Sequence, residues 1–131
     1  MTWAMHDEEF RSVMCLTGPE RYSYCVKKVA DFEEIWGLWN AAGWAVAGNK
    51  RQDELVPVWP HSRFAAACAS EAWSGYEPKA IGIHTWLERW VPGMLEDQRL
   101  VAVFPTPSGQ GVLVSPDRFG EDLLQELSLY E

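Results

Sequence analysis

Three short apolar segments in the middle of the chain constrain its fold most. EIWGLWN, GWAVAGN and LVPVWP are rich in aromatic and β-compatible residues, and they are separated by AAG and by the polar turn NKRQDE. Segments of this length and composition predict strands, and the short AAG connection predicts a hairpin. Pro57 cannot donate a hydrogen bond to a sheet, so the third strand is expected at a sheet edge or with that side of Pro57 left open.

A helical hairpin is predicted over about residues 7–31, before these strands. Its first helix lies within DEEFRSVMCL and is expected to end at Gly18. The second helix begins with a capping box formed by Thr17 and Glu20. It then carries apolar residues at helical spacing, namely Tyr22, Cys25, Val26 and Val29.

Helices and strands alternate in the second half of the chain. HSRFAAACASEAW predicts an alanine-rich helix with Ser62 as its better capping residue. TWLERWVPGML predicts a helix that Pro92 ends or kinks near Val91. KAIGIH, RLVAVFP and GVLVS predict strands. Ser115 is expected to cap a last helix, with an apolar face of Phe119, Leu123, Leu127 and Tyr130.

This order of elements predicts an α+β fold. The 131 residues are too few for two independent domains, so residues 1–131 are expected to form one. Its body, about residues 32–131, is expected to be a mainly antiparallel sheet of about five to six strands with helices packed on one side. The N-terminal helical hairpin precedes that body.

The charge of the chain limits its partners. The formal net charge is −8, so the field of the protein repels phosphate backbones and anionic membrane surfaces. Nucleic acid and membranes are therefore not expected as partners, and a basic protein would be favoured. Eight tryptophans are many for this length, and because each indole N–H needs a hydrogen-bond acceptor, several are expected at the rim of the core or in a cleft.

The cysteines and histidines indicate no metal centre. Cys15, Cys25 and Cys68 form no C-x-x-C pair and are odd in number, which favours buried free thiols in a reducing cytosol. His6, His61 and His84 lie too far apart for compact ligand spacing. No metal, no cofactor and a cytoplasmic location are expected.

No catalytic signature stands out in the sequence. G-x-S-x-G, P-loop and G-x-G-x-x-G patterns are absent, and Cys68 lies in the middle of an expected helix rather than at its N-terminus. His61 follows Pro60 where a strand turns into a helix, at a junction where binding residues often collect. Its position also suits a purely structural role, and the sequence leaves both readings open.

A binding site is expected around aromatic residues near such junctions. In EAWSGYEPKAI, Trp73, Tyr76 and Lys79 could form a wall and a cation for an anionic or peptide ligand, or a loop anchored by its aromatics. No catalytic residue is assigned. The candidate ligand- or partner-binding residues are Trp59, His61, Trp73, Tyr76, Lys79 and Phe104, with Pro105 beside them.

The same segments carry a family resemblance. WGLWNAAGWAV, PVWPHSRFAAACA, WSGYEPKAI, WLERWVPGML and VAVFPTPSGQGVLVSP occur in this order from about Phe32 to the C-terminus. Together they resemble a small bacterial family catalogued as a domain of unknown function, number twenty-seven fifty in that series. The resemblance implies a compact cytosolic bacterial domain, with those candidate residues on one side of the fold, and no catalytic residue. LVPVWPH with the following helix is also similar to the enhanced-serine-sensitivity (SseB-like) domains.

Three functions remain open from the sequence. The first is a non-enzymatic protein-binding domain of adaptor or immunity-like kind, which suits the small size, acidity and aromatic content. The second is a small-ligand binder or enzyme with a pocket around Trp59, His61, Trp73 and Lys79. The third is a homodimer whose exposed tryptophans form its own interface.

Overall fold

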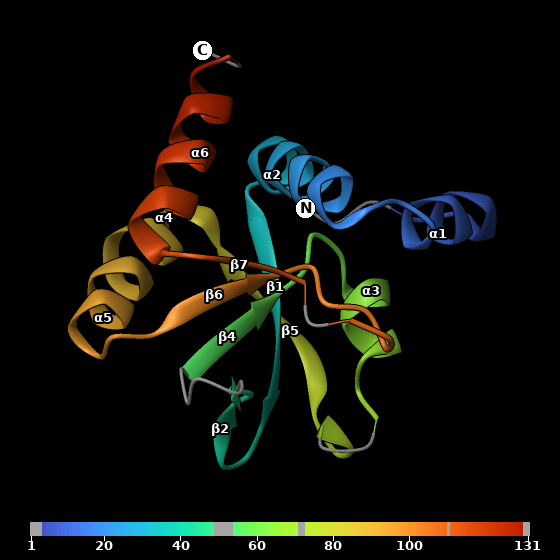
Figure 1. The fold of residues 1–131 in the computed structure, drawn as a ribbon, viewed down its shortest axis with the longest axis horizontal. Helices are drawn as coiled ribbons and strands as arrows, with labels where there is room; N and C mark the ends of the chain where they lie inside the picture. Colours follow the sequence, from blue (N-terminus) through green and yellow to red (C-terminus); the bar gives the residue numbers. More distant parts are fainter. Residues whose placement is uncertain (1–3, 49–53, 71–72, 110, 130–131) are drawn as a thin grey trace.

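Helices and strands alternate along the chain in an α+β arrangement (Figure 1). The computed structural model describes residues 4–48, 54–70, 73–109 and 111–129. Its elements are α1 (Asp7–Met14), α2 (Gly18–Phe32), β1 (Glu34–Asn40), β2 (Gly43–Trp44), β3 (Ala47–Gly48), β4 (Glu54–Val58), α3 (Ser62–Ala67), β5 (Glu77–Gly82), α4 (Ile83–Thr85), the π-helical η2 (Trp86–Trp90), α5 (Val91–Glu96), β6 (Leu100–Val103), β7 (Val112–Val114) and α6 (Pro116–Ser128).

The strands form two sheets joined at one point. The first sheet has the order β2-β1-β5 and is antiparallel, and it contains the predicted hairpin of β1 and β2. The second has the order β3-β4-β6-β7, in which β4 and β6 are parallel. Trp36 of β1 and Trp59, just after β4, exchange two backbone hydrogen bonds of 2.8 Å that link the sheets.

The predicted single sheet is therefore confirmed only in part. The described residues contain more strands than expected, in two sheets, and one pair is parallel. A parallel pair needs a long crossover, and the chain makes it between β4 and β6 through α3, β5 and the helix that follows. The sequence pattern identified most of these elements and the pairing of β1 with β2, but it did not indicate that β4 and β6 would pair.

Pro57 lies within the second sheet rather than at its edge, which excludes the first of the two predicted alternatives. Val58 accepts a hydrogen bond from Phe104, so its polar groups face β6. Backbone groups alternate in direction along a strand, so the nitrogen of Pro57 faces the opposite side. The neighbour on that side, β3, pairs only with Glu54 and Leu55, so it needs no hydrogen bond from Pro57. The other half of the prediction, an open side at Pro57, is confirmed.

The N-terminal helices are confirmed, but they do not pack as a hairpin. The Thr17 hydroxyl accepts from the Glu20 N–H, and the Glu20 carboxylate accepts from the Thr17 N–H, so the capping box forms. Gly18 is the first residue of α2 and does not end α1, which stops at Met14 with Cys15 as its C-cap. Figure 1 shows α1 beyond the end of α2, not alongside it.

Helix α1 is held instead by α2 and α3 through individual side chains. Phe10 stacks on Phe64 of α3 with ring centroids 5.3 Å apart. The Arg63 guanidinium lies 2.6 Å from the Asp7 carboxylate, and this hydrogen bond lowers the pKa of Asp7. The Tyr24 hydroxyl of α2 donates to Glu9 at 2.6 Å.

Residues 83–96 form one helical run through Pro92. The predicted stop near Val91 is wrong, because α5 continues to Glu96. The turn before Pro92 is π-helical, and the Val91 N–H bonds back to the Trp86 carbonyl. A π-helical turn is a usual way for a helix to pass an interruption of its hydrogen-bond ladder.

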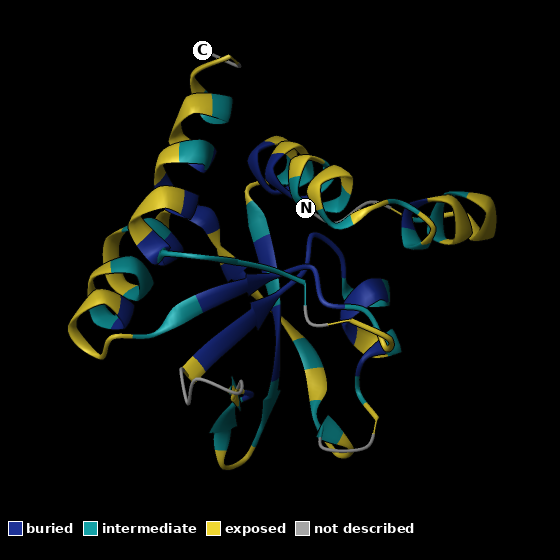
Figure 2. Cartoon of the chain, in the orientation of Figure 1, coloured by how far each residue is buried: buried dark blue, intermediate teal, exposed yellow. Residues whose placement is uncertain are grey.

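The core lies between the sheets and the surrounding helices (Figure 2). Strands β4 and β6 are almost wholly buried, whereas the helices bury one side and expose the other. Ser115 caps α6 as predicted, and Phe119 and Leu123 on its apolar face are fully buried. Tyr130, predicted on the same face, lies outside the described residues. Cys25 and Cys68 are buried free thiols, but Cys15 is exposed, contrary to the prediction.

Candidate functional site

The predicted site residues fall into separate groups in the structure. Trp59, Trp73 and Pro105 meet together with Cys68, and we call this set the aromatic corner. Trp59 is completely buried, and its indole N–H donates to the Pro105 carbonyl at 2.8 Å. The Cys68 thiol donates to the same carbonyl at 3.3 Å, and burial raises the pKa of this thiol to about 11. Trp73 stands edge-on to Trp59 at 6.0 Å and is half-buried.

The loop after β6 closes the aromatic corner and borders a small hollow. Thr106 and Gly109 bond to each other through their backbones. Gly111 has a φ of +81°, and a Cβ there would lie 2.6 Å from the Val103 carbonyl oxygen. The hollow has a volume of about 240 Å³ and is lined by Trp73, Pro105 and small or apolar neighbours, namely Ala47, Gly48, Leu55, Ala102, Thr106, Pro107 and Gly109.

His61 and Phe104 are core residues, whereas Tyr76 is half-buried next to Trp73. His61 is 7% exposed and is the N-cap of α3, because its Nδ1 accepts the Arg63 N–H at 3.0 Å. The predicted cap, Ser62, is instead the first residue of the helix. Phe104 is fully buried, with its ring 4.6 Å from that of Phe64. The Tyr76 N–H donates to the Trp73 carbonyl at 3.1 Å.

Lys79 lies apart from these residues, on the first sheet. In the pairing of β1 with β5 it is opposite Gly37, and Glu77 is opposite Trp39. Trp39 is in turn opposite Trp44 of β2. Directly opposed residues, and residues two apart on a strand, share a face of the sheet. Trp39, Trp44, Glu77 and Lys79 therefore lie on one face, which we call the tryptophan face.

The Lys79 ammonium lies over both indoles of the tryptophan face. Its Nζ is 4.2 Å from the ring centroid of Trp39 and 5.7 Å from that of Trp44. Both distances are within the range of cation–π attraction. Gly37 leaves the sheet flat beneath Trp44, since a Cβ at this position would be 3.2 Å from two atoms of that ring. Trp44 also meets Trp90 edge-on at 4.9 Å, which anchors it to η2.

The tryptophan face is partly open, although Trp90 of η2 packs against Trp44. The end of β1, β2 and the start of β5 lie at the bottom of Figure 1, where no labelled helix covers them. Glu77 and Lys79 are exposed, and both indoles are partly exposed. Val46, two residues after Trp44, is 38% exposed. Aromatic and charged groups are therefore available to a partner here, whereas in the aromatic corner Trp59 is enclosed and Trp73 is half-buried.

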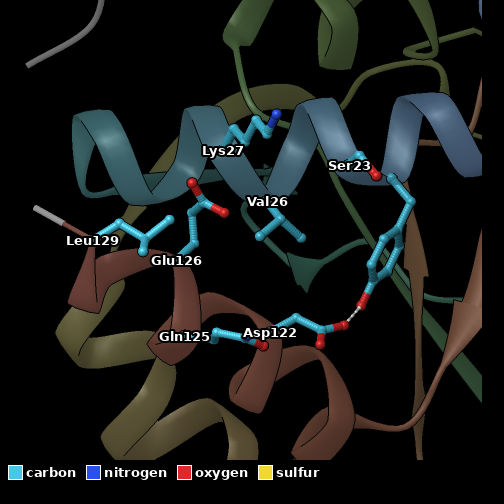
Figure 3. A pocket seen from close by; sticks show the side chains of 8 residues that line it. Ser23, Val26, Lys27, Asp122, Gln125, Glu126 and Leu129 are labelled. Atoms are coloured by element: carbon cyan, nitrogen blue, oxygen red, sulfur yellow. Dashed lines mark hydrogen bonds between the residues drawn. The ribbon is translucent and has the colours of Figure 1, made fainter.

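A groove between α2 and α6 is a further concave surface (Figure 3). One hollow of about 340 Å³ runs between the two helices, and a neighbouring one of about 390 Å³ reaches β7. Both are bordered by Tyr22, Ser23 and Asp122, and the Tyr22 hydroxyl donates to the Asp122 carboxylate. Burial, followed by this hydrogen bond, raises the pKa of Tyr22.

Trp39 and Trp44 were missed as site residues, although the sequence carries a signal for them. Once EIWGLWN and GWAVAGN are paired as a hairpin, the register places the two tryptophans opposite each other. The position of Lys79 had no such signal, because the pairing of β1 with β5 joins strands far apart in the sequence. The α2–α6 groove likewise joins the two ends of the chain.

Two features of other protein classes, a metal-binding cluster and a membrane-spanning helix, are absent from the described residues. No group of three histidine, cysteine, aspartate or glutamate side chains in these ranges is arranged to hold a metal ion. None of the helices in the same part of the chain combines the length and apolar character needed to cross a bilayer.

Comparison with known proteins identifies the chain at the level of a family. No curated protein and no solved structure matches it. A family model described as "Protein of unknown function (DUF2750)" matches residues 22–123. This match begins inside α2, before Phe32, and ends inside α6, so it includes both the aromatic corner and the tryptophan face but not α1. Because the matched region is more than half of the 131 residues, the chain belongs to the DUF2750 family.

Proposed function

We propose that this protein is a non-enzymatic binding domain, of adaptor or immunity-like kind, that holds a protein partner on its tryptophan face. One observation carries the proposal. Two partly exposed indoles, Trp39 and Trp44, lie side by side on a partly open sheet face with the Lys79 ammonium over both. Tryptophans dominate the energetic centres of protein interfaces, because a rigid indole buries much area and loses little conformational freedom.

The rigid setting of the tryptophan face supports the same proposal. Trp44 is held from below by Gly37 and from the side by Trp90, so its ring is already placed before a partner arrives. Such preorganisation lowers the entropy cost of binding. A cytosolic location, expected from the sequence, remains part of this proposal.

The rival small-ligand function is favoured by the hollow of about 240 Å³ beside Trp73 and Pro105. Of the residues expected around a pocket, Trp73 lines this hollow, whereas Trp59, His61 and Lys79 do not. In that case, an apolar ligand would raise the melting temperature and leave the tryptophan face free.

Site-specific cross-linking tests the proposal. A photoreactive phenylalanine analogue is placed at position 39 and, as a control, at position 124 on α6, where Leu124 is 56% exposed. We expect a cross-linked product with a different protein from position 39 but not from position 124, after irradiation in cells of the source organism. No product from position 39 would overturn the proposal. A product of twice the chain's mass would replace it with the homodimer.

A further inference from the structure

The tryptophan face is arranged to receive a positive charge, and the chain itself supplies one. Lys79 Nζ lies within 6 Å of two indole centroids, at 4.2 Å and 5.7 Å. The face of an indole ring is negative, so two rings around one ammonium form a site for a cation. The sequence had suggested Lys79 as a cation for an anionic ligand, but its ammonium is directed at aromatic rings.

The hold on Lys79 is weak. Its side chain is exposed, and in the described part of the chain its ammonium makes these cation–π contacts without an ion pair. Cation–π contacts at exposed sites change binding constants by only about two- to fivefold. Lys79 can therefore leave the rings for water at little cost, and its flexible stem lets it do so.

The surroundings favour a second cation over an anion. Glu77 precedes Lys79 by two residues on β5, shares its face and is exposed opposite Trp39. Its carboxylate can pair with a positive group seated on the Trp39 ring. The chain as a whole has 19 acidic and 11 basic residues, and the resulting charge of −8 attracts basic partners over long distances.

We propose that the partner on the tryptophan face is a basic protein segment whose arginine side chain displaces Lys79 from Trp39 and Trp44. This inference rests on the proposed protein-binding function and names the chemistry of the partner. Arginine is preferred to lysine because its planar guanidinium stacks on an indole while it still donates to a carboxylate such as Glu77. Lys79 thus occupies the site only until the partner arrives.

A peptide titration tests the inference, because Lys79→Ala is expected to strengthen binding of an arginine peptide and not to weaken it. The probe is an acetylated and amidated glycine–serine nonapeptide with one central arginine, and its control has citrulline, the uncharged isostere, at that place. Binding is followed by the NMR signals of the indole N–H groups at physiological ionic strength. We expect saturable shifts at Trp39 and Trp44 with the arginine peptide, no shifts with the citrulline peptide, and none at Trp59, whose N–H is bound to Pro105.

Lys79→Ala is the decisive variant, because it removes the competing cation. The dissociation constant for the arginine peptide is expected to fall about two- to fivefold. Glu77→Gln should weaken binding about twofold, whereas Glu121→Gln, an equal change of charge at an exposed position on α6, should leave it unchanged.

An unchanged or weaker affinity of Lys79→Ala would overturn the inference, and so would the absence of indole shifts in both proteins. If position 39 still cross-links to a partner in either case, the proposed function stands with a partner of other chemistry. If the cross-link also fails, both proposals are discarded.

Discussion

The two tryptophan clusters of this protein differ in how far their indoles are buried and in what the indoles contact. In the aromatic corner, Trp59 is enclosed and donates to the Pro105 carbonyl. On the tryptophan face, Trp39 and Trp44 lie partly in solvent, and their ring faces contact Lys79. An indole that is buried and hydrogen-bonded stabilises the fold, whereas an indole with an open ring face is available to another molecule. Residue type alone therefore did not distinguish structure from function here.

The largest difference between the clusters is expected in stability. Trp59→Ala should lower the free energy of unfolding by about 3–5 kcal/mol, because it leaves a large cavity and removes the stronger of the two donors to the Pro105 carbonyl. Trp39→Ala should cost less than about 1 kcal/mol, since its ring is partly in solvent. Urea denaturation of the two variants makes the comparison, and equal losses would show that the tryptophan face also stabilises the core.

Alanine substitutions at two glycines compare the stability of the aromatic corner with that of the tryptophan face. Gly111→Ala should cost about 1–3 kcal/mol, because the positive φ is strained for alanine and the new Cβ meets the rigid Val103 carbonyl. Gly37→Ala meets only side-chain atoms of Trp44, and a shift of that ring by a few tenths of an ångström relieves the contact, so its cost should be smaller than about 1 kcal/mol. Both are measured by thermal and urea unfolding. A greater loss from Gly37→Ala would mean that Trp44 is more firmly fixed than its exposure indicates.

His61, near the aromatic corner, should behave as a helix cap. His61→Ala removes the acceptor of the Arg63 N–H and should lower stability by about 1 kcal/mol. Asparagine is a good N-cap, so His61→Asn should recover part of this loss. The comparison uses urea midpoints at neutral pH. If both variants were as stable as the wild type, the capping role would be wrong.

The Cys68 thiol is expected to have an effect at high pH only. Burial raises its pKa from 9.0 to about 11 in the folded protein, so the folded state disfavours the thiolate. The resulting stability is fully present below pH 9 and is lost as the pH rises toward and beyond 11. Between pH 8 and 11, wild type should therefore lose more stability than Cys68→Ala. If the stability of wild type and of Cys68→Ala fell equally with pH, the aromatic corner would open readily to water.

Local elements followed well from the sequence, because the interactions that define them act over a few residues. The capping box of Thr17 and Glu20, the cap at Ser115 and the hairpin of β1 and β2 all form as predicted. The exceptions have local physical causes. His61 takes the capping position from Ser62 because its ring nitrogen reaches the Arg63 N–H, and a π-helical turn carries the helix past Pro92.

The candidate site was predictable only in part for the opposite reason. Trp59, Trp73 and Pro105 meet as expected, but Lys79 lies with Trp39 and Trp44. Its place depends on the register of β5 against β1, which pairs residues about forty positions apart along the chain. No periodicity within one segment contains that information.

The sequence by itself determined most of the helices and strands, that the fold is α+β, and which family the chain belongs to. Caps, turns and apolar spacing are short-range, and they are written in consecutive residues. Only the tertiary structure decided that β4 and β6 run parallel, that Trp59 is enclosed and that Trp39 remains open beneath Lys79. These outcomes depend on which distant surfaces cover one another, because burial belongs to the packed chain and not to any single residue.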